Sequence, residues 1–326
     1  MFVETQDRKT RVALLSVISN TALVLMKLVV GILIGSVSVI SEAIHSGMDL
    51  VAAIIAWFSV RTSSKPADDD HPFGHGKIEN VSGTVEALLI FIAAGWIIYE
   101  AVKKFVHPEP IETAVLGVGV MLISAVTNIV VSNKLFKVGR ETDSVALQAD
   151  AWHLRTDVYT SAGVMAGLAL IWLGQWILPG YDLNWLDPVC AFAVALLIVK
   201  AAYDLTVQSA RDLLDANLPE DEQTWIRNLI EENRKTVRGC HDLRTRKAGH
   251  FRFVEFHIQV DPKMTVAISH HLAQGLSRAI RERLAHSTVT IHIEPCTGAC
   301  ADKCLAGCLL AESERGEIAK IVKDNA

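Results

Sequence analysis

Residues 149–159 read A-D-A-W-H-L-R-T-D-V-Y, and they open an apolar run that continues to residue 178. The run is long enough to cross a bilayer, yet charged side chains lie inside it. Ionisable groups within a membrane are costly and generally face the bundle interior or a water-filled path. His153 and Asp157 are four residues apart, so in a helix they share a face, one turn apart. The stretch therefore predicts a spanning helix with one polar, functional face.

The same spacing recurs in residues 41–50, S-E-A-I-H-S-G-M-D-L. Two imidazoles and two carboxylates suit a tetrahedral Zn²⁺ ion. The alternative is two independent polar contacts between helices, but identical spacing on two apolar runs favours one shared site. Asp150 is either an acceptor for the imidazole of His153 or a carboxylate at the membrane surface. We therefore predict a metal site made of His45, Asp49, His153 and Asp157.

The composition indicates a membrane protein. Of the 326 residues, 51% are hydrophobic and only 6% aromatic, so Val, Ile, Leu and Ala dominate, and the mean hydropathy is +0.31. The net charge is −5, and no basic run interleaved with aromatic residues suggests nucleic acid binding. Residues 1–11 are polar, so no cleavable signal peptide is expected. The chain divides into a membrane domain over residues 1–207, a soluble domain over residues 208–295 and a polar tail over residues 296–326.

Six apolar runs reach the length of about 20 residues that a spanning helix needs. They cover residues 12–35, 37–60, 81–105, 114–136, 145–178 and 185–207. Gly35 and Ser36 are expected to form a tight turn between the first two. Lys and Arg gather in the loops on one side, which by the positive-inside rule places both termini in the cytoplasm.

The soluble part alternates between two kinds of pattern. Amphipathic helices are predicted over residues 219–235 and 265–284, and strands over residues 241–247, 252–261 and 287–294. The order α-β-β-α-β predicts a small two-layer, ferredoxin-like α+β domain with one exposed sheet face. The predicted fold is therefore an α-helical membrane protein with six transmembrane helices and a cytoplasmic α+β domain.

A loop between the second and third runs carries further candidate ligands. Residues 68–80 read D-D-D-H-P-F-G-H-G-K-I-E-N, and Asp68, His71 and His75 supply one carboxylate and two imidazoles. Asp69 or Asp70 is an alternative to Asp68. The rival interpretation is a hydrated acidic loop that raises the local cation concentration without a defined site.

These motifs together resemble the cation diffusion facilitator family. The core F-G-H-G-K-x-E at residues 73–79 is highly characteristic of that family, and the two His-x-x-x-Asp pairs are similar to its transport site. The runs H-D-L-R-T-R at residues 241–246 and I-H-I-E-P at residues 291–295 match its cytoplasmic domain. The resemblance implies a homodimer in the bacterial inner (plasma) membrane. It also implies export of a divalent transition metal from the cytoplasm, coupled to proton influx.

The resemblance also assigns residues. It implies that the loop is a second metal site and that Lys77 pairs with Asp204, although a lysine snorkelling to the interface is an equal alternative. It implies a regulatory metal site in the soluble domain, against the alternative of partly exposed histidines on a dimer surface. Glu294 stands where Asp is common, which leaves the geometry there open. The residues of that regulatory site are His241, His257, His270, His292 and Glu294.

The tail departs from the family pattern, because four cysteines recur there every four residues. Thiols at this spacing align along one helical face, and thiolates are soft ligands for Zn²⁺ or Cu⁺. An unstructured tail that bears thiols is the alternative. The cysteines are Cys296, Cys300, Cys304 and Cys308.

The ligand chemistry predicts a zinc exporter. Zn²⁺ binds neutral imidazole and ionised carboxylate, so its binding competes with protons, and a more acidic exterior favours release. His rather than Asp at position 45 favours Zn²⁺, and Cd²⁺, over harder ions. Efflux of Fe²⁺, Mn²⁺ or Co²⁺ by the same fold is the alternative, and a membrane-tethered metal sensor is another. No arrangement of nucleophile and base suggests an enzyme.

Overall fold

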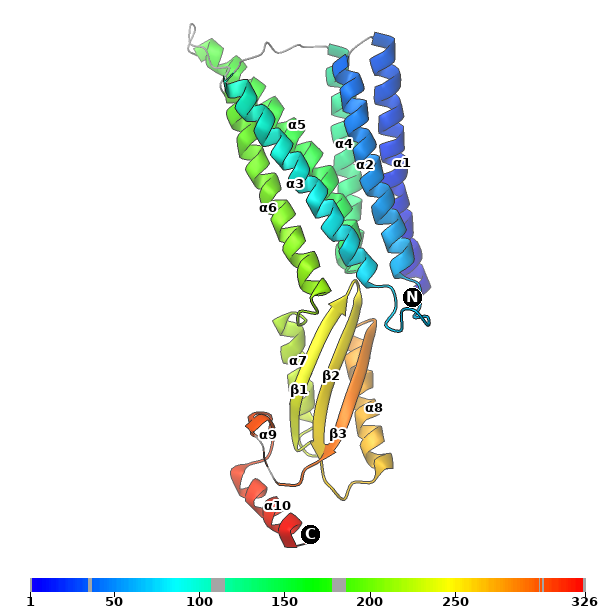
Figure 1. Cartoon of the computed structure of the whole chain (residues 1–326), viewed down its shortest axis with the longest axis vertical. Helices are drawn as coiled ribbons and strands as arrows, with labels where there is room; N and C mark the ends of the chain where they lie inside the picture. Colours follow the sequence, from blue (N-terminus) through cyan, green and yellow to red (C-terminus); the bar gives the residue numbers. More distant parts are fainter. Residues whose placement is uncertain are drawn as a thin grey trace. The chain divides into compact units, whose positions relative to one another are not determined.

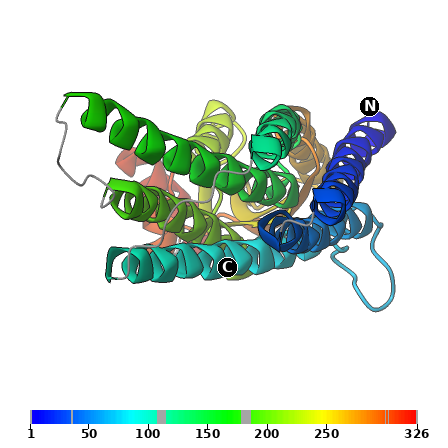
Figure 2. The same cartoon turned by 90° about the horizontal axis from the view of Figure 1, so that it is seen from above.

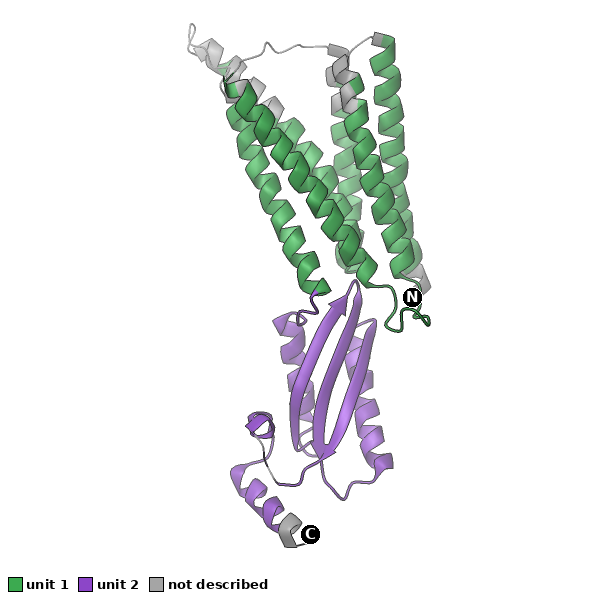
Figure 3. Cartoon of the chain, in the orientation of Figure 1, with its two compact units in different colours: residues 1–213 green, residues 214–326 purple. Residues whose placement is uncertain are grey.

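The structure is a computed structural model that describes residues 2–34, 37–106, 115–177, 186–298, 300 and 302–324. The chain divides into two compact units, Met1–Leu213 and Leu214–Ala326 (Figure 3). The tight turn expected at Gly35 and Ser36 lies outside the described residues.

The first unit is a bundle of long helices that run side by side (Figure 1). Each has between 27 and 33 residues. At about 1.5 Å per residue, even 27 residues span about 40 Å, more than the ~30 Å of a bilayer core. The helices are α1 (Phe2–Ile34), α2 (Val37–Ser63), α3 (Lys77–Val106), α4 (Val115–Glu141), α5 (Val145–Ile177) and α6 (Leu186–Leu213).

Four stretches of these helices have the length and hydropathy of a membrane span, within the residues that the structure describes. They are Gln6–Leu33, Ala43–Ser63, Lys77–Lys103 and Pro188–Leu213. They belong to α1, α2, α3 and α6, so the six predicted spans are not confirmed as a set.

Small residues let the helices approach one another closely. On α3 the side chains of Ala87, Ile90 and Ala94 are fully buried at the spacing of one helical face, and they pack with Ile198 and Ala202 of α6. Figure 2, a view from above, shows α3 and α6 running alongside each other. Further close pairs are α1 with α2 and α4 with α5.

A buried ionic network joins four segments at one end of the bundle. Lys9 Nζ of α1 lies 3.1 Å from Glu79 Oε1 of α3, and the two side chains are only 1% and 0% exposed. Ser63 at the end of α2 and Ser144 just before α5 both donate hydroxyl hydrogen bonds to Glu79. Buried charges persist when they are paired and hydrogen-bonded in this way. The last residue of the F-G-H-G-K-x-E motif is thus a structural anchor.

The second unit has the element order that the sequence predicts. Strand β2 pairs antiparallel with β1 and parallel with β3, giving the sheet order β1-β2-β3. Gly249, at φ 58°, makes the turn between β1 and β2. The elements are α7 (Glu220–Glu232), β1 (Gly239–Ala248), β2 (Phe251–Val260), α8 (Val266–Arg283) and β3 (Ser287–Pro295).

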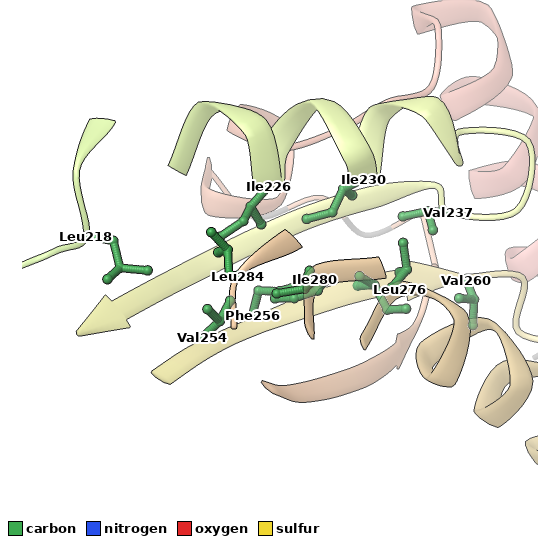
Figure 4. Close-up of a cluster of buried hydrophobic side chains, with 11 residues drawn as sticks. Leu218, Ile226, Ile230, Val237, Val254, Phe256, Val260, Leu276, Ile280 and Leu284 are labelled. Atoms are coloured by element: carbon green, nitrogen blue, oxygen red, sulfur yellow. The ribbon is translucent and has the colours of Figure 1, made fainter. Parts of the chain in front are cut away.

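Helices α7 and α8 cover one face of this sheet, and the core lies between the two layers (Figure 4). Ile226 and Ile230 of α7, one turn apart, are buried against Phe256 and its neighbours on β2. Residues of β2 alternate, with Val254, Phe256, Ile258 and Val260 buried. The residues between them, including His257 and Gln259, therefore face away from the helices.

The tail contains more structure than the sequence predicts. Two further helices, α9 (Asp302–Ala306) and α10 (Glu312–Asp324), follow the sheet. Only Cys304 of the four tail cysteines lies on a helix: Cys296 follows β3, and Cys308 forms a bridge with Gly239. The expectation of one helical face bearing all four thiols is wrong, because the chain turns between them.

Candidate metal centres

The structure brings together the two His-x-x-x-Asp pairs of α2 and α5. His153 Nε2 lies 3.1 Å from Asp49 Oδ1, and His45 Nε2 lies 3.9 Å from Asp157 Oδ1. Ligand atoms of His45, Asp49 and Asp157 all lie within 4.8 Å of one another, a spacing that could hold a metal ion. We call these four residues the central site. Each imidazole faces a carboxylate of the other helix, so the site is built between helices.

Two polar side chains from other helices contact this site or the residue that follows His45 in sequence, and neither is a predicted ligand. Asn128 of α4 is buried, and its Nδ2 donates to Asp157 Oδ2 at 3.3 Å. Lys27 of α1 is buried and donates to the hydroxyl of Ser46 at 2.7 Å, next to His45. A polar residue within an apolar run is their only signal in the sequence.

The Asp150 side chain is 0% exposed, so it is buried among the helices and is not a solvent-exposed carboxylate. Neither of its carboxylate oxygens has a hydrogen bond within the described residues, although the Ser16 hydroxyl lies close by. Glu86 of α3 is equally buried, has one oxygen without a hydrogen bond and is near enough to repel Asp150. Buried polar groups of this kind are commonly satisfied by internal water. A second polar region therefore adjoins the central site.

The loop between α2 and α3 folds around Asp68. Its Oδ1 lies 3.2 Å from His71 Nδ1, and its Oδ2 lies 3.4 Å from His75 Nε2. The backbone N–H of His71 also donates to Asp68 at 2.7 Å, which is the main reason that the pKa of this carboxyl is lowered. Gly74, at φ 81°, allows the turn that stacks the two imidazoles 4.4 Å apart. Of the three adjacent aspartates, Asp68 is the one that joins both imidazoles; we call this trio the loop site.

A third cluster, the sheet site, lies on the face of the sheet opposite α7 and α8. Glu294 of β3 links two histidines of this cluster. Its Oε2 lies 2.9 Å from His241 Nε2, and its Oε1 lies 2.9 Å from His257 Nδ1. His292 Nε2 lies farther away, 3.8 Å from Glu294. Partial burial alone would raise the pKa of Glu294, but the imidazole hydrogen bonds outweigh it and lower the pKa. The longer carboxylate of Glu spans two strands.

His270 is not brought to the sheet site within one chain. It lies exposed on α8, on the layer that covers the other sheet face, and its ring neighbours that of His271 at 6.4 Å. Lys77 reaches the end of α6, where its Nζ donates to the carbonyl oxygen of Leu213 at 3.3 Å. Asp204 lies exposed on the same helix. Pairing of Lys77 with Asp204 stays a prediction.

Comparisons with known proteins identify the family. Residues 13–214 match the family model described as the cation efflux transmembrane domain, and residues 218–296 match the cation efflux protein cytoplasmic domain. The chain belongs to the cation diffusion facilitator family. It is therefore an integral membrane cation efflux transporter, not an enzyme. The tail from residue 297 lies outside both matches.

Relatives cover nearly the whole chain. The protein named uncharacterized transporter sll1263 of Synechocystis is 35% identical over 87% of this chain and 89% of its own. The cation-efflux pump FieF of Cronobacter sakazakii is 30% identical over 88% of this chain and 93% of its own. A solved metal-bound C-terminal domain of the CzcD transporter from Thermotoga maritima is 30% identical, with a TM-score of 0.22, and covers 24% of this chain and 94% of that one.

Proposed function

We propose that this transporter exports Zn²⁺, and also Cd²⁺, from the cytoplasm in exchange for protons, and that the central site carries the ion. The observation that carries the proposal is the pairing of two imidazoles with two carboxylates across α2 and α5, at 3.1 and 3.9 Å. Two nitrogen and two oxygen donors suit tetrahedral Zn²⁺ better than Mn²⁺, which prefers oxygen ligands.

Proton exchange follows from the same ligands. An imidazole must be neutral and a carboxylate ionised before either binds a metal ion, so the ion and protons compete. A site open to a neutral cytoplasm takes the ion, and a site open to a more acidic exterior takes protons and releases it. The resulting cycle is antiport with alternating access, in which movement of α2 and α5 changes the side to which the site is open.

The other two clusters fit roles around this cycle. The loop site combines an exposed carboxylate with an imidazole that is only 9% exposed, an arrangement suited to capturing ions at the entrance to the bundle. The sheet site offers imidazole and carboxylate donors for a regulatory Zn²⁺ in the cytoplasmic domain. We include in the proposal six spans, cytoplasmic termini, a homodimer and a bacterial inner membrane.

The decisive experiment measures Zn²⁺ uptake into proteoliposomes, with and without an imposed pH gradient, for the natural chain and for His45→Asp. We expect uptake to require the gradient, and the variant to lose preference for Zn²⁺ over Mn²⁺ or Fe²⁺. Gradient-independent uptake points to a channel, and no uptake of any divalent ion points to a sensor. If the substitution leaves metal preference unchanged, His45 does not determine selectivity.

A further inference from the structure

The tail beyond the family's cytoplasmic domain is attached to the open edge of the sheet. The backbone N–H of Cys240 in β1 donates to the carbonyl of Gly307 at 2.8 Å, and Gly239 pairs with Cys308 in an antiparallel bridge. Lys303 of α9 forms an ion pair with Asp242 at 3.2 Å. An edge strand has unpaired backbone groups, and the tail covers some of those of β1.

Glycine at position 307 is required for this attachment. A Cβ atom there would lie 1.6 Å from the carbonyl oxygen of Cys240, a separation that no side chain tolerates. The obstacle is backbone, so it cannot swing aside as a flexible side chain can. A larger residue at position 307 is therefore expected to detach the tail, although the chain would keep all of its cysteines.

Docking places tail thiols against the sheet: Cys308 Sγ lies 3.9 Å from the carbonyl oxygen of Arg238. Cys304 Sγ donates to Gln259 Oε1 of β2 at 3.0 Å. Burial raises the pKa of Cys304, and the neighbouring thiols of Cys300 and Cys308 raise it further. All three are partly exposed, and none of them forms a disulfide. Thiolates that repel one another are stabilised by a cation bound between them.

We propose that Cys300, Cys304 and Cys308 form a thiolate site for one soft or borderline d¹⁰ metal ion, of the class of Zn²⁺, Cd²⁺ and Cu⁺. Three S–H protons leave and three metal–sulfur bonds form, with no change of oxidation state. Bonds of about 2.3 Å would set the sulfur atoms about 3.8 Å apart. Among the described residues the thiols are not a group within 4.8 Å, so ion binding draws them together.

Cys296 is left outside this set. Its side chain is buried after β3, and its backbone N–H continues the sheet by donating to the carbonyl of Val260 at 2.9 Å. Cys240 is also left outside, because it lies on β1 and not on the tail.

The thiol site adjoins the sheet site yet differs from it in chemistry. Gln259, which accepts from Cys304, lies two residues from His257 on the same face of β2, about 7 Å along the strand. Sulfur donors prefer softer ions than the imidazole and carboxylate donors of the sheet site. The proposal does not depend on which ion is transported or on proton exchange.

The test titrates Cd²⁺ into the full chain in detergent, after reduction, and follows sulfur-to-cadmium charge-transfer absorption together with bound Cd²⁺ per chain. We expect Cys304→Ser to lose most of the absorption and one bound ion. Cys190→Ser, which removes a thiol of α6, is the matched control and should change neither. Asp157→Ala in the central site should keep the absorption, which separates this site from transport.

Gly307→Val distinguishes a docked site from loose thiols. It keeps all six cysteines, and we expect at least a tenfold weaker Cd²⁺ affinity in the absorption titration. Unchanged affinity in Gly307→Val, or unchanged absorption and stoichiometry in Cys304→Ser, overturns the proposal. Size-exclusion profiles and melting temperatures equal to those of the natural chain establish that the variants are folded.

Discussion

The ion pair between Lys9 and Glu79 offers the clearest test of what holds the bundle together at one end. Both side chains are almost completely excluded from solvent, and the carboxylate also accepts hydrogen bonds from Ser63 and Ser144. Replacing Lys9 by Met removes the cation that lies 3.1 Å from this buried carboxylate. Breaking a buried pair in this way costs about 3–5 kcal/mol of stability.

Replacing both partners gives a different result. The double variant Lys9→Met with Glu79→Gln removes both charges of the pair. The hydroxyls of Ser63 and Ser144 can still form hydrogen bonds with the new amide. Substituting a whole buried pair is often close to neutral, so we expect the double variant to lie within about 1 kcal/mol of the natural chain. The coupling energy between Lys9 and Glu79, measured by this double-mutant cycle, should therefore be several kcal/mol. That value is large for two residues in contact.

The assay is reversible denaturant unfolding of the full chain in detergent for the natural chain, both single variants and the double variant. Arg8→Met is the matched control, because the adjacent Arg8 pairs with Glu141 at 2.7 Å while both side chains are more than 40% exposed. Exposed pairs contribute about 0–1 kcal/mol. If Lys9→Met destabilises no more than Arg8→Met, the anchoring role of Glu79 is refuted.

Three further predictions concern the metal sites and the tail. Asp157→Ala should abolish Zn²⁺ uptake in proteoliposomes while leaving the size-exclusion elution volume unchanged, and normal flux in this variant contradicts the central site. Asn128→Ala should slow uptake, because it removes the hydrogen bond from Asn128 to Asp157. Deleting residues 296–326 should leave transport largely intact, since the tail lies outside the bundle unit, and complete loss of uptake would show an essential role. His292→Ala should reduce the rise in melting temperature that Zn²⁺ gives the full chain, and Glu294→Gln should reduce it more, because Glu294 contacts three imidazoles; an equal rise in all three chains argues against the sheet site.

Local periodicity explains which elements could be predicted from sequence. Alternating apolar residues located strand β2, and a four-residue apolar period located α7, because both patterns depend only on neighbours along the chain. The His-x-x-x-Asp spacing likewise located the central side chains. Their ligand role stays a prediction, whereas their proximity is observed in the structure.

Contacts between distant helices could not be predicted in the same way. Asn128 and Lys27 each stand in an apolar run, and nothing along the chain says that α4 and α1 bring them to α2 and α5. Asp150 was ambiguous for the same reason, because its burial depends on packing against other helices. The tail helix α10 has a local signal, the acidic residues of its first turn, from which a helix could have been predicted.

The crossed arrangement of the central pairs has a consequence for ion release. Spacing along each helix suggests that an imidazole and a carboxylate act together on one helix. In the structure His153 faces Asp49 and His45 faces Asp157, so each close pair joins α2 to α5. An ion held by all four ligands therefore links the two helices. Rotation of one side chain removes one ligand, but relative movement of α2 and α5 opens both pairs together. We infer that ion release depends on movement of the two helices. Protonation of the imidazoles would favour the arrangement in which the helices have moved and the ion is released.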